Sequence, residues 1–162
     1  MLKFHATPWL HDRWDLRDIF FLDSPNDHVD TKQTFLSRHF TNSCLNLSAH
    51  QQASLEPVID NEVIFCLGVA LLELFYGRPI LDFKKPEDEQ GNTTLLLTKY
   101  LIAKRLVEQL KGREPEALVD AVDRCIRCRF DTVSRSLHEG DLLALFIQSV
   151  VNELWKLYLT MA

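Results

Sequence analysis

The residues best suited to chemistry by type and spacing begin with an aspartate close to the start of the chain. Asp15 could act as a general base, because an ionised carboxylate can accept a proton from a nearby hydroxyl group. His11, Asp12 and Asp18 lie close to it in the sequence and could complete an acid/base or metal cluster. However, no candidate nucleophile or paired carboxylate stands at a fixed spacing beside them. We therefore expect these side chains to make structural hydrogen bonds in a surface loop.

Two cysteines form the second chemical candidate. Cys125 and Cys128 have the Cys-x-x-Cys spacing that is used for zinc binding and for redox exchange. A structural zinc site needs four ligands, usually from a second pair, and Cys44 and Cys66 are isolated from one another. We favour two small side chains that partly face the core, with a metal or redox site as the alternative, and we expect no metal and no cofactor.

Composition narrows the class of protein. A chain of 162 residues with 46% hydrophobic and 25% charged residues predicts one globular domain over residues 1–162. Five glycines and six prolines are too few for a disordered chain or a turn-rich all-β fold. The net charge of −5 is unlike that of a nucleic-acid-binding surface, which is normally basic, so no nucleic-acid partner is expected.

The first residues contain no continuous apolar segment of the kind found in a signal peptide. We therefore predict a cytoplasmic protein with reduced thiols. The most apolar stretch, Val63–Pro79, is shorter than the roughly 20 residues that a bilayer requires, so no membrane span is predicted.

That same stretch predicts a central buried helix over residues 60–77, because a helix that is apolar on every side belongs inside a domain. Asp60 or Asn61 can cap its start, since either side chain can accept a hydrogen bond from a free backbone amide. Gly77 suits the left-handed position after a helix, and Pro79 cannot continue one.

The other predicted elements are mainly helices. Aromatic and β-branched residues predict a short strand at Asp18–Leu22, and a second strand at Thr34–Phe40 could pair with it as a hairpin around a turn at Ser24–Asp27. Residues 41–57 have the polar composition of a loop, and the acidic run Glu87–Glu89 is typical of a solvated turn.

Apolar residues at three- and four-residue steps predict helices over residues 94–111, after Pro115, and over 139–159. The fold class is therefore mainly α, with at most a short β-hairpin near the N-terminus. In the last helix the stripe expected to be buried comprises Leu142, Leu145, Phe146, Val150, Leu154, Trp155 and Tyr158.

Several motifs, in order along nearly the whole chain, resemble a protein kinase's C-terminal lobe. The central one is the helix that carries Leu67-Gly68-Val69 and Gly77-Arg78-Pro79. The chain is most similar to a fungal kinase-like family of unknown function that is often linked to domains of the HeLo, prion-inhibition and propagation type. The further matching motifs are His5, Thr7-Pro8-Trp9-Leu10, Trp14, Asp18-Ile19-Phe20-Phe21, Cys125-Ile126-Arg127-Cys128-Arg129-Phe130 and Val150-Val151-Asn152-Glu153-Leu154.

The resemblance implies a degenerate kinase rather than an active one. Phosphoryl transfer requires a Gly-rich loop, a strand lysine and acidic magnesium ligands, but the N-terminal lobe and any Asp-Phe-Gly motif are missing from this sequence. Asp15 would stand at the catalytic-base position. The aspartate that anchors the catalytic loop in active kinases is replaced by Val63, whose side chain accepts no hydrogen bond, so we expect the loop to lose its anchor.

These observations favour a non-catalytic, pseudokinase-like interaction or regulatory domain. By family association its process would be fungal signalling or self/non-self recognition. With half of a kinase fold missing, part of the central helix would be left uncovered, and a partner domain or chain is expected to cover it. A truncated gene model would give the same sequence. The alternatives are a phosphotransferase with Asp15 as base and a simple helical dimerisation module.

Overall fold

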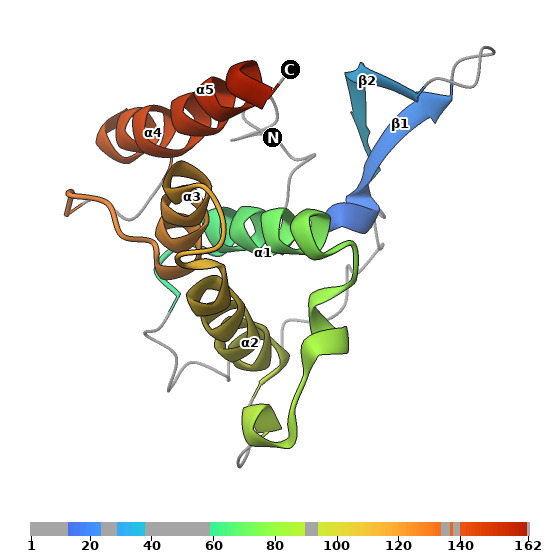
Figure 1. Ribbon diagram of the computed structural model, residues 1–162, viewed down its shortest axis with the longest axis vertical. Coiled ribbons are helices and arrows are strands. Elements are labelled where there is room, and N and C mark those ends of the chain that lie inside the picture. Colours follow the sequence, from blue (N-terminus) through green and yellow to red (C-terminus); the bar gives the residue numbers. More distant parts are fainter. Residues whose placement is uncertain are drawn as a thin grey trace, which may run out of the picture.

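Figure 1 shows the protein in a computed structural model that describes residues 13–23, 29–37, 59–89, 94–133, 137 and 140–161. Helices dominate this part of the chain, and its strands form one antiparallel pair. The predicted fold class, mainly α with a short hairpin near the N-terminus, is confirmed.

Helix α1, Glu62–Tyr76, lies within the predicted range of 60–77. Of the two expected capping residues, Asn61 makes the cap, because its Oδ1 accepts a hydrogen bond from the Ile64 amide at 3.0 Å. The helix ends at Gly77, whose φ of 64° is in the left-handed region that favours glycine.

Helix α1 supplies side chains to two separate apolar clusters. Phe65 and Leu72 belong to one cluster, which also contains Ile102 of α2, Leu95–Leu110. Ile64 belongs to the other, together with Phe146. The central buried helix is therefore confirmed, although burial on every side fails in its final turn, where two side chains are exposed: Leu74 by 66% and Phe75 by 41%.

Helix α3, Glu116–Arg127, packs directly against α1 and contributes to both clusters. The contact is closest at Gly68, where an added Cβ would lie 2.7 Å from Ile126 Cδ1 and 2.9 Å from Cys125 Cβ. Real Cβ atoms essentially never approach that closely. The absence of a side chain at Gly68 therefore allows the two helices to pack this tightly.

Two short 3-10 helices, Ile80–Phe83 and Pro86–Glu89, connect α1 to α2. The interpretation of this acidic segment as solvated is wrong for Asp88, which is only 5% exposed. Its carboxylate lies 2.7 Å from the Arg105 guanidinium of α2 and also accepts the Lys85 amide at 2.8 Å. Arg105 binds the Phe83 carbonyl as well, so it fixes both turns to α2.

The last helix is continuous but irregular. Helix α4, Gly140–Phe146, continues through a π-helical segment, Ile147–Val151, into α5, Asn152–Met161. Leu142, Phe146 and Val150 are buried as predicted. However, Trp155 and Tyr158 are each 59% exposed, so the prediction that they are buried is wrong. A π segment rotates everything after it about the helix axis, and an apolar period of 3.6 residues cannot be extended across it.

One helical span among the described residues, Gly140–Thr160, is long and apolar enough to cross a membrane by length and composition. Core helices of soluble proteins also meet that criterion, but they are mostly buried. Only 17% of the apolar window of this span is buried in the structure, and Phe146 and Val150 are among its buried residues. The absence of a membrane span stays a prediction.

The hairpin consists of β1, Ile19–Asp23, and β2, Val29–Leu36, and it extends away from the helices (Figure 1). Phe20 pairs with Phe35 across the two strands, and both side chains are exposed. The second strand was expected at Thr34–Phe40 but begins at Val29, because the pairing continues back toward the turn. The predicted turn and the loop at residues 41–57 lie outside the described residues.

Candidate functional site

The segment around Asp15 lies along α1 and leads into the hairpin. Leu16–Asp18 forms a single 3-10 turn, and Asp15 caps it. The Asp15 carboxylate accepts the Arg17 amide at 2.8 Å, and the Asp15 amide donates to the Asp18 carboxylate at 2.9 Å. This reciprocal pair is a capping box, which satisfies backbone amides at the start of the turn.

The Asp15 carboxylate is also bound by a guanidinium group. Arg17 Nε lies 3.1 Å from each carboxylate oxygen, and its Nη2 contacts the second one. The hydrogen bonds from the Arg17 side chain lower the pKa of Asp15 below its ordinary value of 3.8, against a smaller opposing effect of burial. Both oxygens therefore have protein partners, and the group is ionised at neutral pH.

Two contacts attach this segment to the start of α1. The Trp14 indole Nε1 donates to the backbone carbonyl of Val63 at 3.3 Å, and the Trp14 side chain is buried. Arg13 Nε lies 2.8 Å from the Glu62 carboxylate. The prediction that the segment is left without an attachment at Val63 is wrong, because the backbone oxygen of Val63 accepts the hydrogen bond from the Trp14 indole.

A cavity of about 250 Å³ lies beneath the segment. Its apolar wall is formed by α1 side chains and by Leu95 and Leu96 at the start of α2, and Trp14 closes one side. Cys66 also lines it, and burial raises the pKa of this thiol to about 12. The thiol is therefore protonated at neutral pH and is a poor nucleophile there. The remaining lining residues are Arg13, Asp15, Arg17, Phe65, Val69, Ala70, Glu73 and Lys99.

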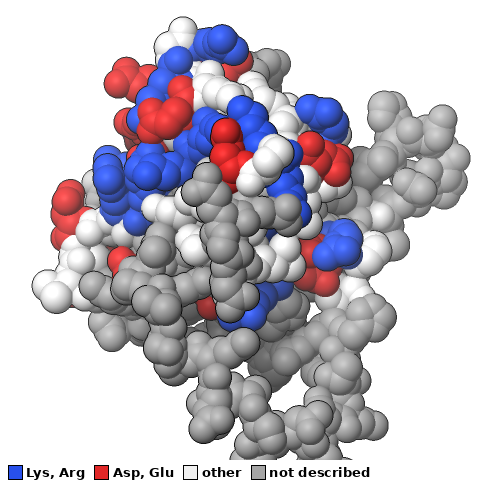
Figure 2. Space-filling model, turned by 90° about the horizontal axis from the view of Figure 1, so that it is seen from below, with Lys and Arg blue, Asp and Glu red and all other residues white. Residues whose placement is uncertain are grey.

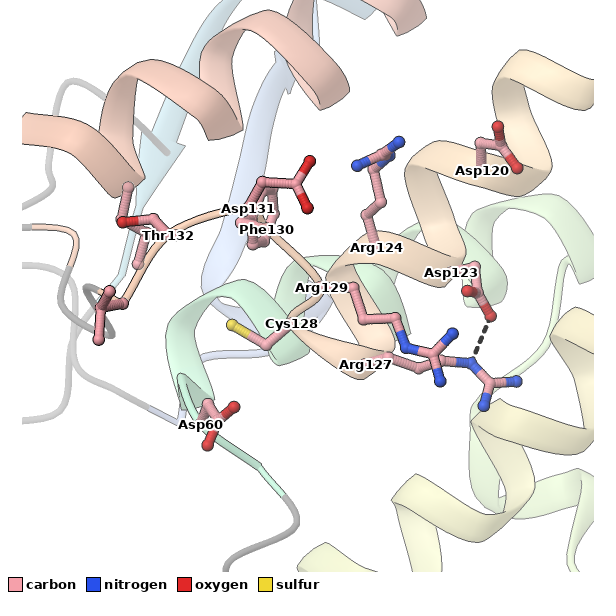
Figure 3. A pocket seen from close by; sticks show the side chains of 12 residues that line it. Asp60, Asp120, Asp123, Arg124, Arg127, Cys128, Arg129, Phe130, Asp131 and Thr132 are labelled. Atoms are coloured by element: carbon pink, nitrogen blue, oxygen red, sulfur yellow. Dashed lines mark hydrogen bonds and ion pairs between the residues drawn. The ribbon is translucent and has the colours of Figure 1, made fainter.

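A second, wider hollow of about 840 Å³ lies beside the C-terminal end of α3 (Figure 3). Arg127 there binds Asp123 and Glu108, each at 2.6 Å. The lining combines basic and acidic side chains, so the hollow does not select a ligand of either charge. Its charged residues are Asp60, Asp120, Asp123, Arg124, Arg127, Arg129 and Asp131. Figure 2 likewise shows both signs of charge interspersed on one face of the described surface.

The structure separates the two cysteines of the Cys-x-x-Cys motif by environment. Cys125 is fully buried in the apolar cluster shared by α1, α3 and α4, as favoured, and burial raises the pKa of its thiol. Cys128 is half-buried and follows the end of α3 in a left-handed conformation with φ of 48°. Within the described ranges, no group of three or more His, Cys, Asp or Glu side chains could hold a metal ion.

Part of the predicted acid/base cluster lies outside the described residues. Asp12 and all six histidines are among the residues not described, whereas Asp15 and Asp18 are brought together. Sequence reasoning missed Trp14 as an anchor and Lys99 as a cavity residue. The spacing of Asp15 and Asp18 does match a capping box. No sequence pattern indicates that Lys99, more than 80 residues away, lies near Asp15.

Comparison with known proteins identifies the family but not an activity. The model of a family described as a domain of unknown function (DUF7580) matches residues 1–154. Because the match covers most of the chain, the protein belongs to this family. No curated protein and no solved structure matches the chain.

Proposed function

We propose that this protein is a non-catalytic, pseudokinase-like domain that acts by binding another polypeptide, in fungal signalling or self/non-self recognition. The observation that carries the proposal is the hydrogen bonding of the Asp15 carboxylate. Its carboxylate caps a 3-10 turn and pairs with Arg17 through both oxygens. A catalytic base must instead be within hydrogen-bond reach of the proton that it removes.

Exposed apolar side chains support a role in binding. Phe20, Phe21 and Phe35 of the hairpin are exposed by 49%, 45% and 42%. Phenylalanines on a projecting two-stranded sheet are typical of a surface that another chain covers. The end of α1 and the start of α2 add exposed Leu74 and Leu95.

The competing proposal is a phosphotransferase that uses Asp15 as its base. It requires Arg17 to release the carboxylate when substrate binds, and the Arg17 side chain is 89% exposed. A helical dimerisation module is the third candidate, and the exposed Trp155 and Tyr158 side chains of α5 favour it.

Thermal unfolding of the full chain with and without millimolar Mg-ATP distinguishes the non-catalytic domain from the phosphotransferase. A ligand that binds the native state stabilises it by RT ln(1 + [L]/Kd), so nucleotide binding would raise the melting temperature. We expect a cooperative transition that Mg-ATP does not move. A magnesium-dependent increase that disappears in Asp15→Asn would contradict the proposal.

The mass of the protein in solution tests the third candidate. Light scattering over a hundredfold range of protein concentration should give the mass of one chain throughout. A mass that doubles with concentration, and returns to that of one chain in Trp155→Ser, would favour the dimerisation module instead.

A further inference from the structure

The cavity beneath the Asp15 segment combines an apolar wall with a lysine that forms no ion pair with the described residues. Its lining includes Phe65, Val69 and Ala70 of α1 and Leu96 of α2. The lining also includes Lys99, one turn further along α2, whose side chain is half-buried.

The other charged groups of the cavity have partners. Arg13 binds Glu62 at 2.8 Å, and Arg17 binds Asp15. Glu73 Oε1 accepts the Ile80 amide at 2.8 Å. Among the described residues, no carboxylate lies within ion-pair distance of Lys99. A lysine that lines an apolar cavity and forms no ion pair with the described residues is matched by a ligand that carries a negative charge.

The size of the cavity decides between classes of ligand. Its volume of about 250 Å³ is just below the roughly 300–1,000 Å³ of drug-sized ligand sites. It therefore fits one ring or one branched alkyl group. A nucleotide is larger and carries several negative charges, whereas one unpaired lysine can match a single charge. A protein partner would need roughly 800 Å² of contact surface, which this cavity does not provide.

We propose that this cavity is a binding site for a small apolar monocarboxylate. The ring or alkyl group of the ligand packs against Phe65, Val69 and Leu96, and its carboxylate pairs with Lys99 Nζ. This inference does not depend on the proposed function, since it concerns a small ligand and not a partner chain.

The test compares two probes on the full chain by ligand-observed NMR titration. 3-Phenylpropionate supplies a ring and a carboxylate, and 3-phenylpropionamide has nearly the same shape without the charge. We expect the acid to bind at least about tenfold more tightly, because a hydrogen bond to a charged group is stronger than a neutral one. Equal affinity of the two probes, or no binding of either at millimolar concentration, would overturn the proposal.

Two variants locate the site. Lys99→Gln should remove the preference for the acid, and Lys104→Gln, an exposed lysine of the same helix that does not line the cavity, should retain it. Ala70→Leu should fill the cavity and weaken both probes. If Ala70→Leu does not fold, the comparison of the two lysine variants decides the question. Equal loss of affinity in Lys99→Gln and Lys104→Gln would contradict the assignment, because it would indicate a general effect of charge.

Discussion

Asp15 shows how one residue can fit a chemical role by type and serve a structural one by position. By type it is a candidate for a general base, because an ionised carboxylate can accept a proton. In the structure it is the acceptor for a backbone amide and for a guanidinium group on the same neighbour, Arg17. Both contacts fix the turn that leads into β1.

Replacing Asp15 by alanine tests this structural role. We expect Asp15→Ala to lower the free energy of unfolding at neutral pH by about 1 kcal/mol, the usual effect of losing a helix cap. Asp15→Asn is the control, because asparagine is an equally good cap. Urea denaturation measures both. An Asp15→Ala protein as stable as the wild type would show that the cap contributes nothing.

The same residue gives stability a dependence on pH. The pKa of Asp15 is lowered in the folded state, so its contribution is present above the ordinary value of 3.8 and is lost as pH falls through the folded value. The difference between wild type and Asp15→Ala should therefore shrink as pH is lowered below about 4. A difference in unfolding free energy that grows as pH is lowered would contradict this prediction.

At the scale of elements, the contact between α1 and α3 depends on Gly68. We expect Gly68→Ala to destabilise the protein by about 1–3 kcal/mol, the usual cost of overpacking, because the new methyl group meets Ile126 and Cys125. Gly140→Ala is the matched control, since nothing lies within 4 Å of its added Cβ. Thermal denaturation of both variants measures the difference. Equal stability of the two would contradict the tight packing.

The buried pair of Asp88 and Arg105 holds the 3-10 turns against α2. Removal of Arg105 leaves the buried Asp88 carboxylate with the Lys85 amide but without its counter-charge, so Arg105→Ala should cost about 3 kcal/mol. The double variant with Asp88→Ala should cost less than the sum of the two single changes. Lys111→Ala, which breaks a half-exposed pair with Glu108, should destabilise the protein much less than Arg105→Ala does. Additive effects of the two buried residues would indicate that the pair is not coupled.

The sequence predicts where the helices lie better than it predicts which of their side chains are buried. The composition and end signals of α1 are local, so its range was predicted to within two residues, although the sequence left Asp60 and Asn61 open as the cap. Asp88 was misassigned because its partner, Arg105, is 17 positions away. Trp155 and Tyr158 were misassigned because the π segment at Ile147–Val151 breaks the period that placed them inside.

At the scale of the whole molecule, stability should be uneven. Helices α1 and α3 lie between two apolar clusters, whereas the hairpin of β1 and β2 projects from the helices (Figure 1). A single two-stranded hairpin is at best marginally stable in water. We therefore expect hairpin amides to exchange with deuterium well before those of α1, as measured by hydrogen exchange with mass spectrometry. Equal protection of both would mean that the hairpin is covered.

We expect the segment from Arg13 to Asp18 to act as a structural attachment on α1 rather than as a catalytic loop. The most direct test is an NMR titration of the Asp15 side-chain carboxyl carbon, with and without Mg-ATP. We predict a pKa below 3.8 that Mg-ATP leaves unchanged, since Arg17 occupies both carboxylate oxygens. An ordinary or raised pKa, or a resonance that moves on addition of Mg-ATP, would contradict this account.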